Sequence, residues 1–334
     1  MPERCNCQTR VPEPVRACFH AEKVTLQVQI AALRGRSDVC KISARGGVIL
    51  KGICMIVSGT RRPNVLTSRL FRLRFALAQA LGMTIEVRTD TGSYRFACRS
   101  YTEYKRAVTL LQKEEGTIRW LRDTLRPGDT FCDIGANVGL YSVFSGNLVG
   151  ETGHILSFEP HAANALSLMQ NMALNGLSSR AKVISAALGD RNGFFDFNII
   201  EATAGSAMSQ LDRTLDGHER PFVPVLREFK AAFTLDHLVA EGIVPTPDVI
   251  KVDVDGNELL VMAGMRNVLG SAKRPRSVQV EVSPHYAEDL DAFMDGLGYR
   301  AQKRHRTDIG LRKLARGADP VLIAHNAIYA PAAA

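Results

Sequence analysis

From Thr130 onward the chain alternates short apolar runs with amphipathic segments, and this pattern constrains the fold more than any other feature. The apolar runs have the length of strands, and the segments between them have helical periodicity. Such alternation favours an α/β fold, with a mainly parallel sheet and helices on both faces. The expected strands are Thr130–Ile134, His154–Phe158, Lys182–Leu188, Val249–Val254, Ser277–Val282 and Val321–His325. The expected helices are Leu140–Leu148, Ala162–Leu174, Leu235–Glu241, Glu258–Leu269 and Tyr286–Leu297.

The residues before this alternation predict two further segments. Residues 1–62 lack clear periodicity, so we expect them to be poorly ordered or loosely attached, and Met55 is an alternative start. Residues 63–115 form a basic helical and strand region, and residues 116–330 form the main domain. Within them we expect an Arg-rich amphipathic helix over Val65–Leu81, paired strands Ile85–Arg88 and Tyr94–Cys98, and a helix over Tyr101–Leu125. Asn192-Gly193 predicts a hairpin, and the long polar segment Glu201–Phe233 predicts a lid or binding loop.

The charge is unevenly distributed along the chain, whose formal net charge is +8. Residues 1–130 carry a net +12, residues 131–299 a net −9, and residues 300–334 a net +5. The basic ends could contact a membrane surface, a nucleic acid or an anionic glycan, or they could be ordinary solvated faces. We expect contact with an anionic surface through the basic N-terminal region. No stable nucleic-acid complex is expected, because aromatic and basic residues do not interleave there.

Cysteine usage and hydropathy indicate the compartment. The seven cysteines are odd in number and scattered, which is typical of a reduced, intracellular protein. Arg4, Arg10 and Arg16 interrupt the region where a secretory signal would need an apolar run. No apolar stretch is long enough to span a bilayer. We therefore predict a cytoplasmic protein without a transmembrane segment.

The strongest chemical signal is the block from Phe131 to Gly139, which reads as a strand, a glycine turn and the start of a helix. Gly135 allows the backbone to approach a ligand closely, and the helix N-terminus offers free N–H groups. Asp133, near the end of the strand, could receive a ligand ammonium.

A second signal lies at Glu159, which closes the next expected strand 20 residues after Gly139. An acid at this position can hydrogen-bond both ribose hydroxyls of an adenosine cofactor. The nicotinamide fingerprint G-x-G-x-x-G is not met, because its second glycine, which makes room for a pyrophosphate, is missing. S-adenosylmethionine has an adenosine, an ammonium and a carboxylate but no phosphate, so it fits better than NAD.

These blocks closely resemble the FkbM family of S-adenosylmethionine-dependent methyltransferases. The resemblance rests on Pro127-Gly128-Asp129, Asp133–Gly139, Tyr141-Ser142, Phe158-Glu159-Pro160, Leu174-Asn175, Ala187-Leu188-Gly189-Asp190, Thr234-Leu235-Asp236, Ile250–Gly256 with Glu258, and Val280-Glu281. It implies a Rossmann-like class I methyltransferase fold with a seven-stranded sheet, and methylation of hydroxyl groups on sugars, lipids or natural products. The chain departs from the family at Asp255, where Glu is usual, and in the length of the Glu201–Phe233 segment.

The predicted site residues fall into three groups. We expect Asp133, Gly135, Ala136, Asn137, Gly139, Glu159 and Ala187 to bind the cofactor. Asp253 lies at the end of the fourth expected strand, where such sheets bind ligands, and it is the first candidate for the base or substrate holder. Lys251, Glu281 and His285 are further catalytic candidates. Asp255 and Glu258 are expected at the substrate. The acids could also hold Mg²⁺, although we expect no metal.

The sequence thus predicts an S-adenosylmethionine-dependent methyltransferase that acts on a hydroxyl oxygen of a small-molecule or glycan acceptor. Two alternatives remain open at this point. One is a nucleic-acid methyltransferase, and the other is a protein that binds S-adenosylmethionine without catalysis.

Overall fold

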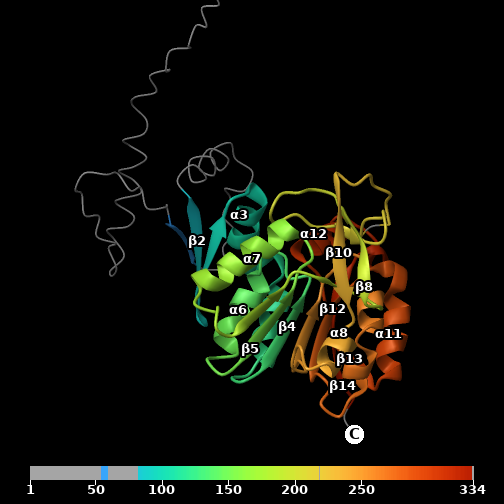
Figure 1. Cartoon of the computed structure of the whole chain (residues 1–334). Helices are drawn as coiled ribbons and strands as arrows, with labels where there is room; N and C mark the ends of the chain where they lie inside the picture. Colours follow the sequence, from blue (N-terminus) through green and yellow to red (C-terminus); the bar gives the residue numbers. More distant parts are fainter. Residues whose placement is uncertain (1–53, 59–81, 218, 333–334) are drawn as a thin grey trace, which may run out of the picture. The chain divides into compact units, whose positions relative to one another are not determined.

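A computed structural model describes residues 54–58, 82–217 and 219–332, all of which belong to one compact unit, Leu50–Ala334. Its centre is a seven-stranded sheet with the strand order β13-β14-β12-β11-β4-β5-β6 (Figure 1). The strands are β4 (Thr130–Ile134), β5 (His154–Phe158), β6 (Ala181–Ile184), β11 (Val249–Val252), β12 (Ser277–Val282), β13 (Tyr299–His305) and β14 (His325–Pro331). Only β14 runs antiparallel to its neighbours. The predicted fold class is confirmed.

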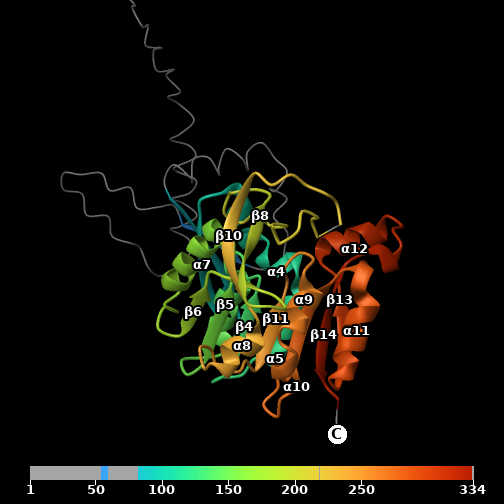
Figure 2. The same ribbon diagram turned by 45° about the vertical axis from the view of Figure 1, so that its right-hand side comes forward.

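Helices cover both faces of this sheet, and each face has its own apolar core (Figures 1 and 2). Strand β4 shows why, because Phe131 packs into one core while Cys132 and Ile134 pack into the other. The first core holds side chains of α3 (Tyr101–Val108), α4 (Leu110–Lys113), α5 (Glu115–Thr124), α6 (Leu140–Leu148) and α7 (Ala162–Leu174). The second holds side chains of α8 (Leu235–Ala240), α9 (Glu258–Ala263), α10 (Arg266–Gly270) and α11 (Ala287–Gly296). Among the described residues, no helix is long and apolar enough to cross a membrane.

A small sheet precedes the main sheet in the sequence and is hydrogen-bonded to α7. It contains β1 (Cys54–Ser58), β2 (Met83–Thr89) and β3 (Gly92–Cys98), with β2 and β3 antiparallel as predicted. Asn171 of α7 links this sheet to the turn after β4. Its Oδ1 accepts a hydrogen bond from the Ala97 backbone N–H at 2.9 Å, and its Nδ2 donates to the Val138 carbonyl at 2.8 Å.

A third sheet interrupts the alternation and carries the long polar segment. Its order is β7-β10-β8-β9, formed by β7 (Ala187–Leu188), β8 (Gly193–Ile199), β9 (Gln210–Leu211) and β10 (Leu226–Phe233). Residues 200–225 connect β8 to its antiparallel partner β10 and include β9. The remaining elements are α12 (Asp308–Ala315) and the short 3₁₀ helices η1 (Pro284–Tyr286) and η2 (Pro320–Leu322).

Four sequence predictions about these elements need correction. The hairpin at Asn192-Gly193 is wrong, since the antiparallel partner of β8 is the distant β10. The expected strand Lys182–Leu188 divides into β6 and β7, which lie in different sheets. The expected strand Val321–His325 is wrong because η2 occupies its start and β14 begins only at His325. The expected helix Tyr101–Leu125 is interrupted at Thr109 and Glu114.

One strand was missed, and two further predictions fall largely outside the described residues. Strand β13 was not predicted, because nearly all its side chains are polar and exposed. The helix expected over Val65–Leu81 and nearly all of the segment 1–62 lie outside the described residues.

The two bonds of Asn171 lead to a prediction about stability. Asn171 is 1% exposed, so Asn171→Ala would leave two backbone groups without partners, at a cost of about 2–4 kcal/mol of unfolding free energy. Gln170→Ala, on the same helix but only half-buried, should cost less than about 0.5 kcal/mol. Urea unfolding followed by circular dichroism measures both, and equal losses would contradict the linking role of Asn171.

Candidate functional site

The register of the central strands sets polar side chains in two rows at the carboxyl ends of β4, β11 and β12. Lys251 of β11 pairs with Asp133 of β4 on one side and with Gln279 of β12 on the other. Side chains alternate along a strand, so the residues two positions later face the same side. Asp253 and Glu281 therefore form the next row, at the edge where parallel sheets bind ligands.

Lys251 is a buried cation between two carboxylates. Its Nζ lies 2.9 Å from Asp253 Oδ2 and 3.9 Å from Asp133 Oδ1, and 5.0 Å from the centre of the Tyr141 ring. Burial opposes its charge, but the two carboxylates raise the pKa of Lys251 above its usual value, so it is an ammonium. Asp133 also accepts a hydrogen bond from the Ser142 hydroxyl at 2.5 Å.

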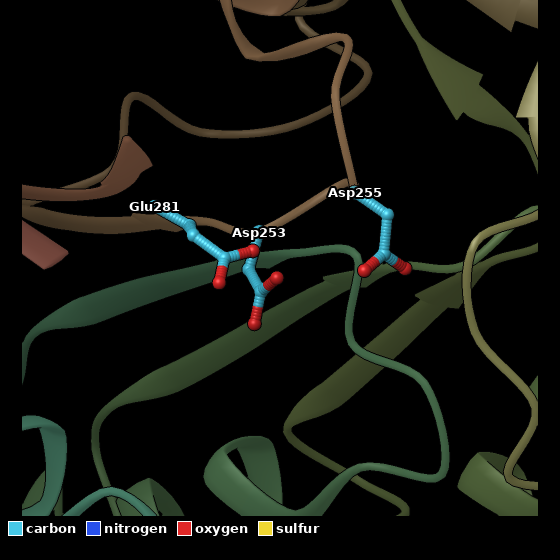
Figure 3. Close-up of side chains that lie close together, drawn as sticks. All are labelled: Asp253, Asp255 and Glu281. Atoms are coloured by element: carbon cyan, nitrogen blue, oxygen red, sulfur yellow. The ribbon is translucent and has the colours of Figure 1, made fainter. Parts of the chain in front are cut away.

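Asp253, Glu281 and Asp255 form an acidic cluster beside this cation. Figure 3 shows the Asp253 and Glu281 carboxylates next to each other. Burial opposes ionisation of Asp253, yet Lys251 and a hydrogen bond shared with Glu281 hold the pKa of Asp253 well below its usual value. The Asp253 charge and burial raise the pKa of Glu281 well above its usual value. At neutral pH the pair thus shares one proton, held mainly by Glu281.

The same three acids are close enough to share a divalent cation. Oxygens of Asp253, Asp255 and Glu281 lie within 4.8 Å of one another, and carboxylate oxygen is the ligand type that Mg²⁺ prefers. Asp253 already has a positive partner in Lys251. Glu258, the fourth acid considered from the sequence, does not belong to this group.

Glu258 instead holds the turn that follows β11. Its side chain is fully buried and accepts hydrogen bonds from the backbone N–H groups of Val254 and Gly256 and from the Tyr286 hydroxyl. Burial raises the pKa of Glu258 to about 7. Within this turn Asp255 has a φ of 59°, a left-handed conformation that is uncommon for a residue with a side chain. The bonds of Glu258 support that conformation.

A first cavity opens where β4, β5 and β11 end. It is lined by Ile134, Gly135, Asn137, Phe158–His161, Asn164, Ala186–Leu188, Phe197, Ser206–Ser209, Leu211, Asp253–Asp255 and Asn257. One of its acids is Glu159, whose carboxylate accepts hydrogen bonds from the backbone N–H groups of Asn137 and His161 at 2.7 and 2.8 Å. Burial raises the pKa of Glu159 to about 7.

Part of the long connection between β8 and β10 forms one wall of this cavity, and we call residues 201–211 the strap. The Ser206 carbonyl accepts hydrogen bonds from Asn137 Nδ2 at 2.7 Å and Asn164 Nδ2 at 3.1 Å. Asp255 Oδ2 accepts one from the Met208 N–H at 2.8 Å. The strap is thus bonded to the turns after both β4 and β11. Asp255 therefore lines this cavity and also belongs to the acidic cluster.

A second cavity adjoins the first and shares Gly135, Asn137 and Asp253 with it. Helix α3 contributes Arg106 to its wall, α4 contributes Leu110 and Lys113, and Glu114 follows α4. The remaining lining residues are Ala136, Val138, Leu140, Tyr141 and Lys251. Arg106 Nε donates to the Gly205 carbonyl of the strap at 2.8 Å. Burial, and then Glu114, raises the pKa of Tyr141 far above its usual value. The wall of this cavity therefore holds the cations Arg106, Lys113 and Lys251 and the carboxylates Glu114 and Asp253.

The two cavities suit the chemistry of S-adenosylmethionine. A Cβ on Gly135 would lie 1.8 Å from the Asp253 carbonyl oxygen, so only glycine permits this close approach of the two turns. The first cavity has no Lys or Arg among its described lining residues. A pyrophosphate such as that of NAD would find no cation there, whereas a nucleoside needs none.

Some predicted residues do not reach the cavities. Asp133 lines neither of them and contacts Ser142 and Lys251 instead. Gly139 begins α6 with a φ of 84° and packs against Leu168, where a Cβ would clash. His285 is exposed and lines a different cavity.

Other functional residues were missed by the sequence analysis. Asn164 and His161 follow the Phe158-Glu159-Pro160 block closely, and their short distance from Glu159 is a signal that could have identified them. Arg106 and Lys113 lie before the recognised motifs, where nothing in the sequence distinguishes them from other surface cations.

The chain is similar to a known protein family and to a curated relative. Residues 133–301 match the family described as the Methyltransferase FkbM domain. The hexuronic acid methyltransferase AglP of Haloferax volcanii is 28% identical over 183 residues, which are 53% of this chain and 66% of the relative. The family match confirms the predicted resemblance.

Solved structures were also compared. Methyltransferase FkbM from Methylobacillus flagellatus is 12% identical, with 82% of this chain and 73% of that chain covered and a TM-score of 0.38. Aeropyrum pernix fibrillarin, solved with bound S-adenosylmethionine, is 13% identical, with 73% and 81% covered and a TM-score of 0.39. Scores this low do not indicate a shared substrate.

The raised pKa of Glu159 predicts pH-dependent binding of a ribose. Adenosine has the ribose hydroxyls but no amino-acid group, so its own charge is constant between pH 6 and 8. Ionised Glu159 is the better acceptor for these hydroxyls. Because its pKa is about 7, we expect adenosine affinity to rise about tenfold from pH 6 to pH 8 and then level off. Burial lowers the pKa of His161, so His161 adds little charge in this range.

Calorimetric titration at several pH values tests this expectation. Glu159→Gln should bind adenosine more weakly, with no dependence on pH, while the exposed Asp190→Asn should keep the original profile. A flat profile in the unaltered protein would contradict the assignment of the ribose to Glu159.

Proposed function

Because the chain belongs to the FkbM methyltransferase family, we propose that it transfers a methyl group from S-adenosylmethionine to a hydroxyl oxygen of a sugar. The observation that supports this most strongly is the meeting of two cavities at Gly135, Asn137 and Asp253. One cavity suits a nucleoside, the other suits an amino acid, and an acid lies at their junction.

In this proposal the first cavity holds the adenosine part of the cofactor. Glu159 accepts hydrogen bonds from the ribose hydroxyls, and the apolar walls around Ala187 and Phe158 contact the adenine. Asn137 keeps the strap over the nucleoside through its bond to Ser206. Asp133 acts indirectly, by helping to hold Lys251.

The second cavity holds the amino-acid part. Arg106 and Lys113 are positioned for its carboxylate, and Glu114 for its ammonium. Gly135 and Ala136 leave room beside them. When bound, S-adenosylmethionine supplies a methyl group carried on a positively charged sulfur.

Asp253 receives the acceptor hydroxyl. It is ionised at neutral pH, its side chain is 27% exposed, and it can therefore orient the hydroxyl and take its proton as the oxygen gains the methyl group. Glu281 shares a proton with Asp253. When Asp253 takes the proton of the acceptor hydroxyl, Glu281 releases one proton to solvent. Lys251 cannot be the base because it is already protonated, and its role is to keep Asp253 ionised. His285 lies in a different cavity, so we assign it no proton transfer.

A sugar acceptor is favoured by the curated relative, whose name describes methylation of a hexuronic acid. The aligned region covers 66% of that relative, so the acceptor is part of the proposal. The open side of Asp253, together with Asp255, gives a polar surface of the kind that binds hydroxyl-rich ligands.

The proposed role of Asp253 predicts a separation of binding from transfer. Asp253→Asn should bind S-adenosylmethionine within about threefold of the unaltered protein but transfer its methyl group about 10²–10⁴-fold more slowly. Transfer of tritiated methyl groups to uronic-acid oligosaccharides measures the second effect, and calorimetry measures the first. Asp190→Asn is the matched control, since Asp190 is exposed and lines no cavity.

Two results would overturn the proposal. Undiminished transfer by Asp253→Asn would remove this residue from the reaction. Tight cofactor binding with no transfer to any sugar by the unaltered protein would instead favour a non-catalytic role.

A further inference from the structure

A third cavity, which shares no lining residue with the first two, is not used by the mechanism above. It has a volume of about 390 Å³, within the range of small-ligand sites. Tyr286 from η1 forms one wall, and Arg306, Pro320, Val321 and His325 from the connection between β13 and β14 form the other.

This cavity is adjacent to the proposed acceptor position. The Tyr286 hydroxyl bonds to Glu258 and lies 3.3 Å from the Glu281 carbonyl oxygen. In the sheet, His325 pairs with Val282, directly beyond Glu281. The Tyr286 side chain therefore connects this cavity to Glu281, which belongs to the acidic cluster with Asp253.

Arg306 differs from the other arginines around it. Arg300, Arg304 and Arg312 each form an ion pair with an aspartate. Arg306 has no carboxylate within 4 Å among the described residues, and its only hydrogen bond runs from Nη2 to the Pro320 carbonyl at 2.9 Å. Its Nε is buried and has no acceptor. A partly buried charge without a partner is unfavourable in free energy. A bound anion would supply the missing partner.

The positive charges of Arg304 and Arg306 act on His325, which lines the same cavity. Burial, Arg304 and Arg306 lower the pKa of His325, with Asp291 acting weakly in the opposite direction. The acids that line the cavity, Glu288 and Asp289, are exposed and lie in the first turn of α11, where the helix dipole favours them. His285 is exposed at the same rim.

We propose that this third cavity is an acceptor subsite that binds the carboxylate of a sugar acid through Arg306. The guanidinium matches a carboxylate in geometry, and Val321 and Pro320 contact the apolar face of the sugar ring. The inference rests on the proposed function and narrows its acceptor to acidic sugars. Arg306 determines specificity and takes no part in the chemical step.

The test uses the full-length chain and three probes that share a hexose ring: D-glucuronate, D-glucose and glucose 1-phosphate. Binding is followed through the ring signals of His325 in NMR spectra, assigned with His325→Gln. We expect glucuronate to bind, to raise the pKa of His325, and to bind at least tenfold more tightly than glucose. Arg306→Gln should abolish this preference. Arg316→Gln, an equal change of charge outside the cavity, should keep it.

Three outcomes would overturn the subsite: equal binding of glucuronate and glucose, an equal effect of the two arginine variants, or a preference for glucose 1-phosphate. In transfer assays Arg306→Gln should raise the KM for a uronate acceptor at least tenfold, with little change in kcat. Its affinity for S-adenosylmethionine should be unchanged. If transfer depends on Asp253 but not on Arg306, the subsite fails and the proposed function stands.

Discussion

The buried ammonium of Lys251 is the interaction on which the site depends. It lies between Asp133 and Asp253, so one cation joins the ends of β4 and β11. A lone buried charge costs several kcal/mol, and losing one partner of a buried pair costs about 3–5 kcal/mol. Any shift of β11 relative to β4 would separate Lys251 from Asp133 and so lower the unfolding free energy. The pairing therefore fixes the register that brings the Gly135 turn against the Asp253 backbone, where the two cavities meet.

The same cation organises the protons at the sheet edge. By keeping Asp253 ionised, it leaves the shared proton on Glu281. One turn further on, Glu258 supports the unusual conformation of Asp255, which bonds to the strap. Cofactor enclosure and acceptor chemistry are therefore built on consecutive residues of one turn. Substitutions there should be interpreted with both effects in mind.

The elements that the sequence predicted correctly are those with a clear local pattern of apolar and polar residues. Strands β4, β5 and β12 and helices α6 and α7 match their predicted bounds, because each has a clear period and a clear boundary. Glu159 and Asp253, which line the first cavity, could be proposed from the sequence because each lies at the carboxyl end of an expected strand. The strand β13 was missed because an exposed edge strand needs no apolar alternation. Arg106 and Arg306 could not be identified, since only tertiary packing brings α3 and the β13–β14 connection to the site.

A double-mutant cycle tests the central interaction most directly. The unfolding free energy is measured for the unaltered protein, Lys251→Met, Asp253→Asn and the double variant. If the Lys251 ammonium and Asp253 stabilise each other, each single change strongly lowers the unfolding free energy. The loss in the double variant is then smaller than the sum of the two single losses, by about 1–3 kcal/mol. Additive losses would show that the two groups do not interact, and the account of the site would then be wrong.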